Sequence, residues 1–344
     1  MDRFAWVSAR TVPEAAAATS TTVAEVMSRP ADATRSAEAS VVKAGGIDLL
    51  DLLKEDLLAP TTLVSLAGIA GLDTVAEENS GGLRIGAMVT LARLAEHPGV
   101  QARYRILADA AQGSASPQIR HVAALGGNLL QRPHCWYLRA AEYRCLRKGG
   151  GHCFAIAGEN RYHAIFDNRL CAIVHPSTAA TALVALGASV ELANADGSLR
   201  RVLLEDFFVP PGVDLQREND LKPHEIVTAV VVPAPAADVR MAHLKQGEKD
   251  SFDWPIAEVA VVLELAPDGV CRRAAIVLGA AAPMPHRARA AEAVLTGKHI
   301  VDDVARQAAR AALDGATPLA QNGYKLPLFG TLVRRSVLQA AAVR

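Results

Sequence analysis

Two pairs of adjacent glycines place the strongest limits on how this chain folds and what it binds. The first pair lies in "SVVKAGGIDLLDLLK", between a β-branched run and a helical pattern, and the second lies in "SASPQIRHVAALGGNLLQ". Glycine lets a backbone approach a ligand closely, and a helix N-terminus favours phosphate through its free N–H groups and its dipole. Each pair taken alone is explained equally well by a tight turn. Two such pairs in one chain favour a large diphosphate ligand.

The order of elements predicts an α+β chain built from three regions. A chain of 344 residues exceeds one simple core, and we place the regions at residues 1–55, 56–236 and 237–344. The first has helical stretches at "TVPEAAAATS" and "ATRSAEAS", and the second ends at the proline-bearing hinge "VVPAPAAD". In the third, "IAEVAVVLELAPDGVCRRAAIVLGA" predicts an antiparallel hairpin with Asp-Gly in its turn, followed by alanine-rich helices.

Charge and hydropathy exclude several classes of partner. The 36 basic residues balance 36 acidic ones, so no electrostatic footprint for nucleic acid is expected. No apolar run reaches the roughly 18 residues that a membrane-spanning helix needs. The N-terminus lacks the pattern of a signal peptide, so the chain by itself is expected in the cytoplasm. Export together with a signal-bearing partner would place it in the periplasm instead.

Four of the five cysteines fall within 37 residues, and this clustering indicates a metal site. Their spacings fit neither the CxxC pairs of structural zinc sites nor the ligand run of bacterial ferredoxins. Sulfur ligation selects soft metals, which leaves zinc and an iron–sulfur cluster open. The fifth cysteine, Cys271, lies on a strand of the C-terminal hairpin and is expected to be a plain buried thiol. The four clustered cysteines are Cys135, Cys145, Cys153 and Cys171.

The segment around these cysteines is basic. Between residues 132 and 171 there are seven Arg or Lys residues against three acids, which suits either kind of anionic metal–thiolate site. Its three histidines, His134, His152 and His163, are expected to pack or to donate hydrogen bonds rather than to bind metal.

Several motifs together resemble one family. "KAGGIDLLDLLK", "LRIGAMVTLARL", "PQIRHVAALGGNLLQ" and "HPSTAATALVALGASVEL" are similar to the flavin-binding medium subunit of the xanthine dehydrogenase, or molybdenum hydroxylase, family. "HLKQGEKDSFDWPIAEVAV" and "VLGAAAPMPHRARAAEAVLTGK" resemble the closing domain of the same subunit. The resemblance covers essentially the whole chain. It implies a two-subdomain FAD-binding fold of the vanillyl-alcohol-oxidase/PCMH type, followed by a domain with an antiparallel sheet and helices.

The resemblance also implies which residues contact FAD. Four positions depart from the family pattern: Ala124 replaces a threonine, Arg120-His121 replaces Arg-Asn, Thr178 replaces an acid, and His243 replaces a tyrosine. These departures put single contacts in doubt and not the cofactor. The implied FAD-binding residues are Lys43, Ala44, Gly45, Gly46, Ile47, Asp48, Leu49, Leu50, Thr90, Gly126, Gly127, Asn128, Leu129 and Lys245.

A cysteine-bearing insert at residues 131–175 is similar to that of a minority of the family. The medium subunits of 4-hydroxybenzoyl-CoA reductase and bacterial aldehyde oxidoreductase carry a [4Fe–4S] cluster in such an insert. The resemblance therefore implies a [4Fe–4S] cluster on Cys135, Cys145, Cys153 and Cys171. The basic residues around it, Arg144 and Arg147 among them, would raise its potential or dock an acidic acceptor such as a ferredoxin.

The family chemistry implies that this chain transfers electrons and that the substrate site lies elsewhere. A large subunit with a molybdenum cofactor and a small subunit with two [2Fe–2S] clusters are the expected partners, with an external electron acceptor. The expected reaction is oxidation of an aromatic aldehyde, and an aromatic acyl-CoA reductase or a purine dehydrogenase are the alternatives. No catalytic residue for substrate chemistry is expected in this chain. Two rivals of other classes are a zinc-stapled scaffold subunit without FAD and a self-sufficient flavoenzyme of the vanillyl-alcohol oxidase type.

Overall fold

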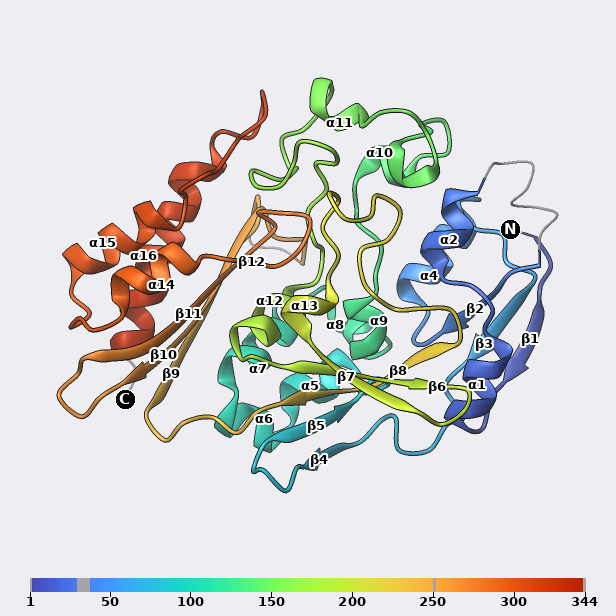
Figure 1. Cartoon of the computed structure of the whole chain (residues 1–344), viewed down its shortest axis with the longest axis horizontal. Coiled ribbons are helices and arrows are strands. Elements are labelled where there is room, and N and C mark those ends of the chain that lie inside the picture. Colours follow the sequence, from blue (N-terminus) through green and yellow to red (C-terminus); the bar gives the residue numbers. More distant parts are fainter. Residues whose placement is uncertain (1, 30–37, 250–251, 343–344) are drawn as a thin grey trace.

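The computed structural model describes residues 2–29, 38–249 and 252–342, which form three sheets with associated helices (Figure 1). The N-terminal unit lies at the right of the view, the five-stranded sheet at the centre, and the C-terminal helices at the left. Of the helix predicted at "ATRSAEAS", residues 33–37 lie outside the described residues, and the end of that stretch enters a strand at Ser40.

The N-terminal unit is a small parallel sheet with helices. Its strands are β1 (Ala5–Ser8), β2 (Ser40–Lys43) and β3 (Thr62–Ser65), and β3 lies between the other two. Since β3 pairs with both, this unit continues past the boundary predicted at residue 55. Its helices are α1 (Val12–Ala18), α2 (Val23–Ser28) and α4 (Ile47–Lys54).

The middle unit is a five-stranded antiparallel sheet in the order β4-β5-β8-β6-β7. Its core lies between this sheet and the helices, and it reaches one face of the C-terminal sheet. Helix α12 is buried along its whole length, since it consists of alanine, leucine, valine and two threonines and carries no charged residue. The strands are β4 (Val75–Glu77), β5 (Leu83–Gly86), β6 (Ser189–Asn194), β7 (Leu199–Leu203) and β8 (Glu225–Val232). The helices are α5 (Leu91–Glu96), α6 (Pro98–Arg103), α7 (Arg105–Gln112), α8 (Pro117–Arg120), α9 (Leu125–Leu129), α12 (Thr178–Ala185) and α13 (Leu204–Phe207).

The C-terminal unit confirms the predicted antiparallel hairpin and its helices. Strands β10 and β11 pair across a turn in which Gly269 has φ of 88°. A second core covers the other face of this sheet with α14, α15 and α16, so the central strands are apolar on both sides. The strands are β9 (Val239–Gln246), β10 (Ala257–Leu265), β11 (Cys271–Gly279) and β12 (His286–Arg287). The helices are α14 (Arg289–Leu295), α15 (Asp302–Ala311) and α16 (Lys325–Ala342).

The insert, residues 131–175, contains little regular structure and lies at the top of the view in Figure 1. It has two short helices, α10 (Trp136–Arg139) and α11 (Phe154–Ala157), and a 3₁₀ turn at Leu146–Lys148. Its second half is held by side chains near the start of α16. Buried Asn322 donates through Nδ2 to the carbonyls of His163 (3.0 Å) and Ala164 (3.1 Å).

Lys325, fully buried, adds a second anchor. Its Nζ donates to the carbonyls of Tyr162, His163 and Ala280, at 3.2, 3.1 and 2.7 Å. Burial lowers the pKa of this lysine to about 7. The insert is therefore fixed to the C-terminal unit both by these polar contacts and by Ile165 and Phe166, which are buried in the core of that unit.

We expect Asn322→Ala to lower the free energy of unfolding by about 1–3 kcal/mol, because the Leu319 N–H loses its acceptor and two buried carbonyls each lose one of their two donors. Urea denaturation followed by circular dichroism measures this loss. Gln307→Ala, an exposed polar truncation on α15, is the matched control and is expected to change stability little. Equal stability of the two variants would contradict this role for Asn322.

Candidate cofactor site

A large cavity of about 580 Å³ opens where the three units meet. Its volume lies within the range of about 300–1,000 Å³ typical of ligand sites. The N-terminal unit contributes the turn before α2 and the start of α4 to the lining. The middle unit contributes α8, α9, the segments around them and the segment leading into β8. The C-terminal unit contributes β9 and the loop after it. Residues far apart in the sequence thus form one site, which we call the large cavity.

The first glycine pair, Gly45 and Gly46, starts α4 at the wall of the large cavity. Gly46 is the N-cap with φ of 92°, a left-handed conformation that glycine adopts without strain. Because this N-cap has no side chain, no side-chain hydrogen bond occupies the first N–H groups of α4. A Cβ on Gly45 would lie 2.1 Å from the Val122 carbonyl oxygen, so the segment before α9 packs directly on this loop.

The second pair, Gly126 and Gly127, lies inside the first turn of α9, which also lacks a side-chain cap. A Cβ on Gly126 would come within 2.9 Å of the Ala87 Cβ, so packing requires this glycine. A Cβ on Gly127 would meet only the Ala44 Cβ, at an ordinary 3.6 Å. The packing of the protein therefore does not explain Gly127, which faces the large cavity.

Ten of the fourteen predicted FAD-contact residues line the large cavity. Both glycine pairs are brought together there, and Lys245 reaches it from β9, where its Nζ donates to the carbonyls of Gly113 (2.8 Å) and Asp253 (2.6 Å). The ten are Ala44, Gly45, Gly46, Ile47, Asp48, Leu49, Gly126, Gly127, Asn128 and Lys245.

Four of the predicted residues lie outside this lining. Lys43 places its Nζ over the Trp6 ring, 5.7 Å from its centroid. Thr90 caps α5 by accepting the Arg93 N–H at 3.2 Å. Leu129 is buried in the core of the middle unit, and Leu50 points outward from α4. The positions of these residues in the sequence, beside a glycine pair or in a family motif, did not indicate where their side chains point.

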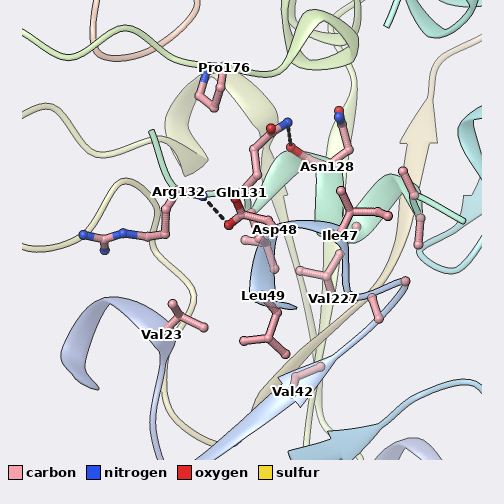
Figure 2. A pocket seen from close by; sticks show the side chains of 18 of the residues that line it. Val23, Val42, Ile47, Asp48, Leu49, Asn128, Gln131, Arg132, Pro176 and Val227 are labelled. Carbon is pink, nitrogen blue, oxygen red and sulfur yellow. Dashed lines mark hydrogen bonds between the residues drawn. The ribbon is translucent and has the colours of Figure 1, made fainter. Parts of the chain in front are cut away.

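Asp48 joins two walls of the large cavity, and Gln131 makes a local contact within one of them (Figure 2). Asp48 accepts the backbone N–H of Arg132 at 2.9 Å, and Gln131 donates to the Asn128 carbonyl at 2.8 Å. The Arg132 side chain extends away from both contacts. The Asp48 carboxylate also accepts from the Arg139 guanidinium, so it holds the insert in place although it lines the cavity.

An aromatic pair stands at the cavity where the insert meets the loop after β9. The rings of His134 and Trp254 are in contact, with centroids 4.0 Å apart and planes tilted by 33°, and both residues line the cavity. Burial, followed by the nearby Arg139 charge, lowers the pKa of His134 to about 3. Sequence reasoning missed Trp254 and Phe252 as lining residues, although two aromatics in the polar loop "EKDSFDWP" were a usable signal.

Cys135, Cys145, Cys153 and Cys171 converge on a second, much smaller cavity, which we call the cysteine cavity. Its other lining residues are aromatic, aliphatic or basic, and none of the described residues that line it is acidic. Cys271 lies apart, fully buried on β11, with its thiol donating to the Arg273 carbonyl at 3.4 Å. The other residues that line the cysteine cavity are Tyr137, Leu138, Leu146, Arg147, Phe154, Ala155, His163 and Ile173.

The thiols of the cysteine cavity contact basic side chains and one another. His163 Nε2 lies 3.2 Å from Cys135 Sγ, and burial lowers the pKa of that histidine to about 4. A hydrogen bond with the Cys171 thiol lowers the pKa of Cys153 to about 6, whereas burial raises the pKa of Cys135 to about 12. Within the described parts of the chain, no three His, Cys, Asp or Glu side chains are grouped closely enough to hold a metal ion.

Arg147 is buried, which removes it from the exposed docking surface suggested by the charge of the insert. Its side chain is 1% exposed, Nη1 pairs with Glu218 at 2.8 Å, and Nε donates to Cys171 Sγ at 3.3 Å. Arg144, Arg161 and Arg169 are the exposed arginines of the same segment. The high density of arginine in the sequence did not indicate which of these side chains are buried and which are exposed.

The two cavities are neighbours. Gln131, Arg132 and His134 line the large cavity, and the next residue, Cys135, lines the cysteine cavity. Glu218 also lines the large cavity and contacts Arg147 of the cysteine cavity. One short segment and one ion pair thus form the wall between the two sites.

Comparison with known proteins agrees with this architecture. Residues 2–235 match the family "FAD binding domain in molybdopterin dehydrogenase", and residues 242–340 match "CO dehydrogenase flavoprotein C-terminal domain". The chain is 36% identical over 327 residues to the aldehyde oxidoreductase FAD-binding subunit PaoB of Escherichia coli, covering 92% of this chain and 98% of that subunit. It is 28% identical to the carbon monoxide dehydrogenase medium chain of Hydrogenophaga pseudoflava, covering 87% and 88%.

A solved structure has the same fold. Carbon monoxide dehydrogenase from Hydrogenophaga pseudoflava, in a form that lacks the Mo-pyranopterin moiety of its cofactor, superposes with a TM-score of 0.73 at 27% identity, covering 99% of this chain and 98% of that chain. Across residues 2–29, 38–249 and 252–342, no helix combines the length and apolarity needed to cross a bilayer. The predicted fold class, an FAD-binding fold followed by an antiparallel C-terminal domain, is confirmed. The chain belongs to the FAD-binding medium subunits of the molybdenum hydroxylase and CO dehydrogenase family.

Proposed function

We propose that this chain is the electron-transfer subunit of a molybdenum-containing aldehyde oxidoreductase, with FAD in the large cavity and a [4Fe–4S] cluster in the cysteine cavity. The observation that carries this proposal is the contact between the two cavities through residues 131–135. When bound, FAD links two-electron and one-electron carriers, and a neighbouring cluster supplies a one-electron station. The chain supplies the binding groups, their spacing and the electrostatics.

The large cavity suits a dinucleotide with a diphosphate. The first turn of α4 presents N–H groups that the N-cap leaves free, and such groups favour an anion. Gly127 keeps a second stretch of backbone open to close approach. Asn128 is oriented by the Ser177 hydroxyl, which donates to its Oδ1 at 2.6 Å, so its amide N–H₂ can face the ligand.

The cysteine cavity suits an iron–sulfur cluster better than zinc. A zinc ion needs its ligands around one point, whereas each iron of a [4Fe–4S] cluster takes a separate thiolate. The four thiols line one common cavity, so each could bind a separate iron. The acid-free lining favours a soft metal, and Arg147 and Lys148 supply positive charge nearby.

The substrate and partners are proposed from the relatives. Identity is 36% to an aldehyde oxidoreductase FAD-binding subunit, and 24–26% to FAD subunits of xanthine and nicotinate dehydrogenases. We therefore favour an aldehyde, an aromatic one in particular, over a purine or an aromatic acyl-CoA. The substrate would bind a large molybdenum-cofactor subunit, and a small subunit with two [2Fe–2S] clusters would deliver electrons to this chain. An external acceptor such as a ferredoxin would remove them.

We expect Gly127→Ala to weaken FAD binding by at least about tenfold, or about 1.4 kcal/mol, while leaving the fold unchanged. The new Cβ meets only the Ala44 Cβ at 3.6 Å in the protein itself, but it would stand between the backbone and the ligand. Titration of apoprotein with FAD, followed by flavin fluorescence, measures the affinity.

Gly212→Ala is the control for this change, because a Cβ there has open space around it and Gly212 does not line the large cavity. Unaltered FAD affinity in Gly127→Ala, with the wild-type melting temperature, would contradict ligand approach at this backbone.

We expect Ala substitution of Cys135, Cys145, Cys153 or Cys171 to remove most of the iron and acid-labile sulfide from anaerobically purified chain, because each thiolate binds one iron. Cys271→Ala is the matched control, since this buried thiol lies on β11 away from the cavity. Elemental and sulfide analysis provide the measurement. One equivalent of zinc, with neither iron nor sulfide, would favour the zinc-stapled alternative.

A further inference from the structure

Three buried charged side chains form much of the wall between the two cavities. Glu218 is 6% exposed and pairs with Arg132 at 3.1 Å on one oxygen and with Arg147 at 2.8 Å on the other. Arg132 and Arg147 are 2% and 1% exposed. Arg132 lines the large cavity and Arg147 lines the cysteine cavity.

The charges of this trio do not balance. Two guanidinium groups share one carboxylate, which leaves one buried positive charge uncompensated within the trio. Buried charge is costly unless it is paired. Within the part of the chain that the structure describes, Arg132 Nε and Nη2 and Arg147 Nη2 also lack a hydrogen-bond partner. The wall is therefore prepared for an anionic occupant in the cavities beside it.

Arg147 is the member of the trio that touches a thiol. Its Nε donates to Cys171 Sγ at 3.3 Å while Glu218 holds the other edge of the guanidinium. Hydrogen bonds to cluster sulfurs and nearby positive charge favour the more negative, reduced state of an iron–sulfur centre. Glu218, 71 residues downstream of Arg147, fixes the guanidinium in this position.

We propose that Arg147, positioned by Glu218, raises the reduction potential of the centre held by the four cysteines and thereby sets its potential relative to the adjoining flavin. This inference rests on the proposed [4Fe–4S] cluster and adds one residue that controls its potential. Arg147 is a positioning residue here, since its Nε–H contacts the ligand sulfur and not a reacting substrate.

The test is an EPR-monitored redox titration of the full-length chain, purified without oxygen. We expect Arg147→Gln to lower the reduction potential of the cluster by at least about 59 mV. For a one-electron centre this corresponds to about a tenfold change in the ratio of oxidised to reduced cluster. This variant loses both a positive charge and an N–H···S hydrogen bond.

Two matched variants separate these causes. Arg169→Gln removes a positive charge two residues from Cys171 but from an exposed side chain, and should leave the potential almost unchanged because solvent screens it. Arg132→Gln removes the other buried guanidinium of the trio without removing the contact to sulfur. Its shift should be clearly smaller than that of Arg147→Gln.

If Arg147→Gln yields no folded, cluster-loaded chain, Arg147→Lys takes its place. It keeps the buried charge and loses the planar fork, and we expect a smaller negative shift. A potential for the Arg147 variants equal to that of Arg169→Gln would overturn the inference, as would equal shifts for Arg147→Gln and Arg132→Gln. Wild-type chain without iron and sulfide would instead overturn the proposed cluster, so the two failures are distinguishable.

Discussion

The carboxylate of Asp48 joins the segments on which both cavities depend. It lies in the first turn of α4, two residues after Gly46, and accepts hydrogen bonds from the backbone N–H of Arg132 and the guanidinium of Arg139. Arg132 follows α9 with the second glycine pair, and Arg139 ends α10 inside the insert. One carboxylate therefore connects both walls of the large cavity with the segment that carries Cys135.

The two cavities are built by different means. Backbone groups dominate the large cavity at the glycine pairs, where Cβ atoms would collide with the protein or reduce the space for a ligand. Side chains build the cysteine cavity, within a segment of little regular structure that Asn322 and Lys325 fasten to the C-terminal unit. A backbone-lined site suits a long ligand with phosphates, and a side-chain cage suits a compact metal centre.

The sequence predicted local features better than distant partners. The glycine pairs, the Asp-Gly hairpin and the convergence of four cysteines follow from short motifs, and the structure brings them together as expected. The pairing of β3 with β1 and β2 did not follow, because parallel pairing is formed between distant segments. The burial of Arg147 was equally hidden, since it depends on Glu218, which lies far along the chain. Asp48 lines the large cavity as predicted, but the role of its carboxylate in holding the insert depends on Arg132 and Arg139, which lie far along the chain.

We propose that one chain holds a flavin and a four-iron centre in adjoining cavities. Anomalous X-ray scattering from crystals of the anaerobically purified chain, recorded at the iron and zinc edges, tests it most directly. We expect a compact iron peak enclosed by Cys135, Cys145, Cys153 and Cys171, with flavin density beside it in the large cavity. A zinc signal at the cysteines, or no metal signal there, would contradict it.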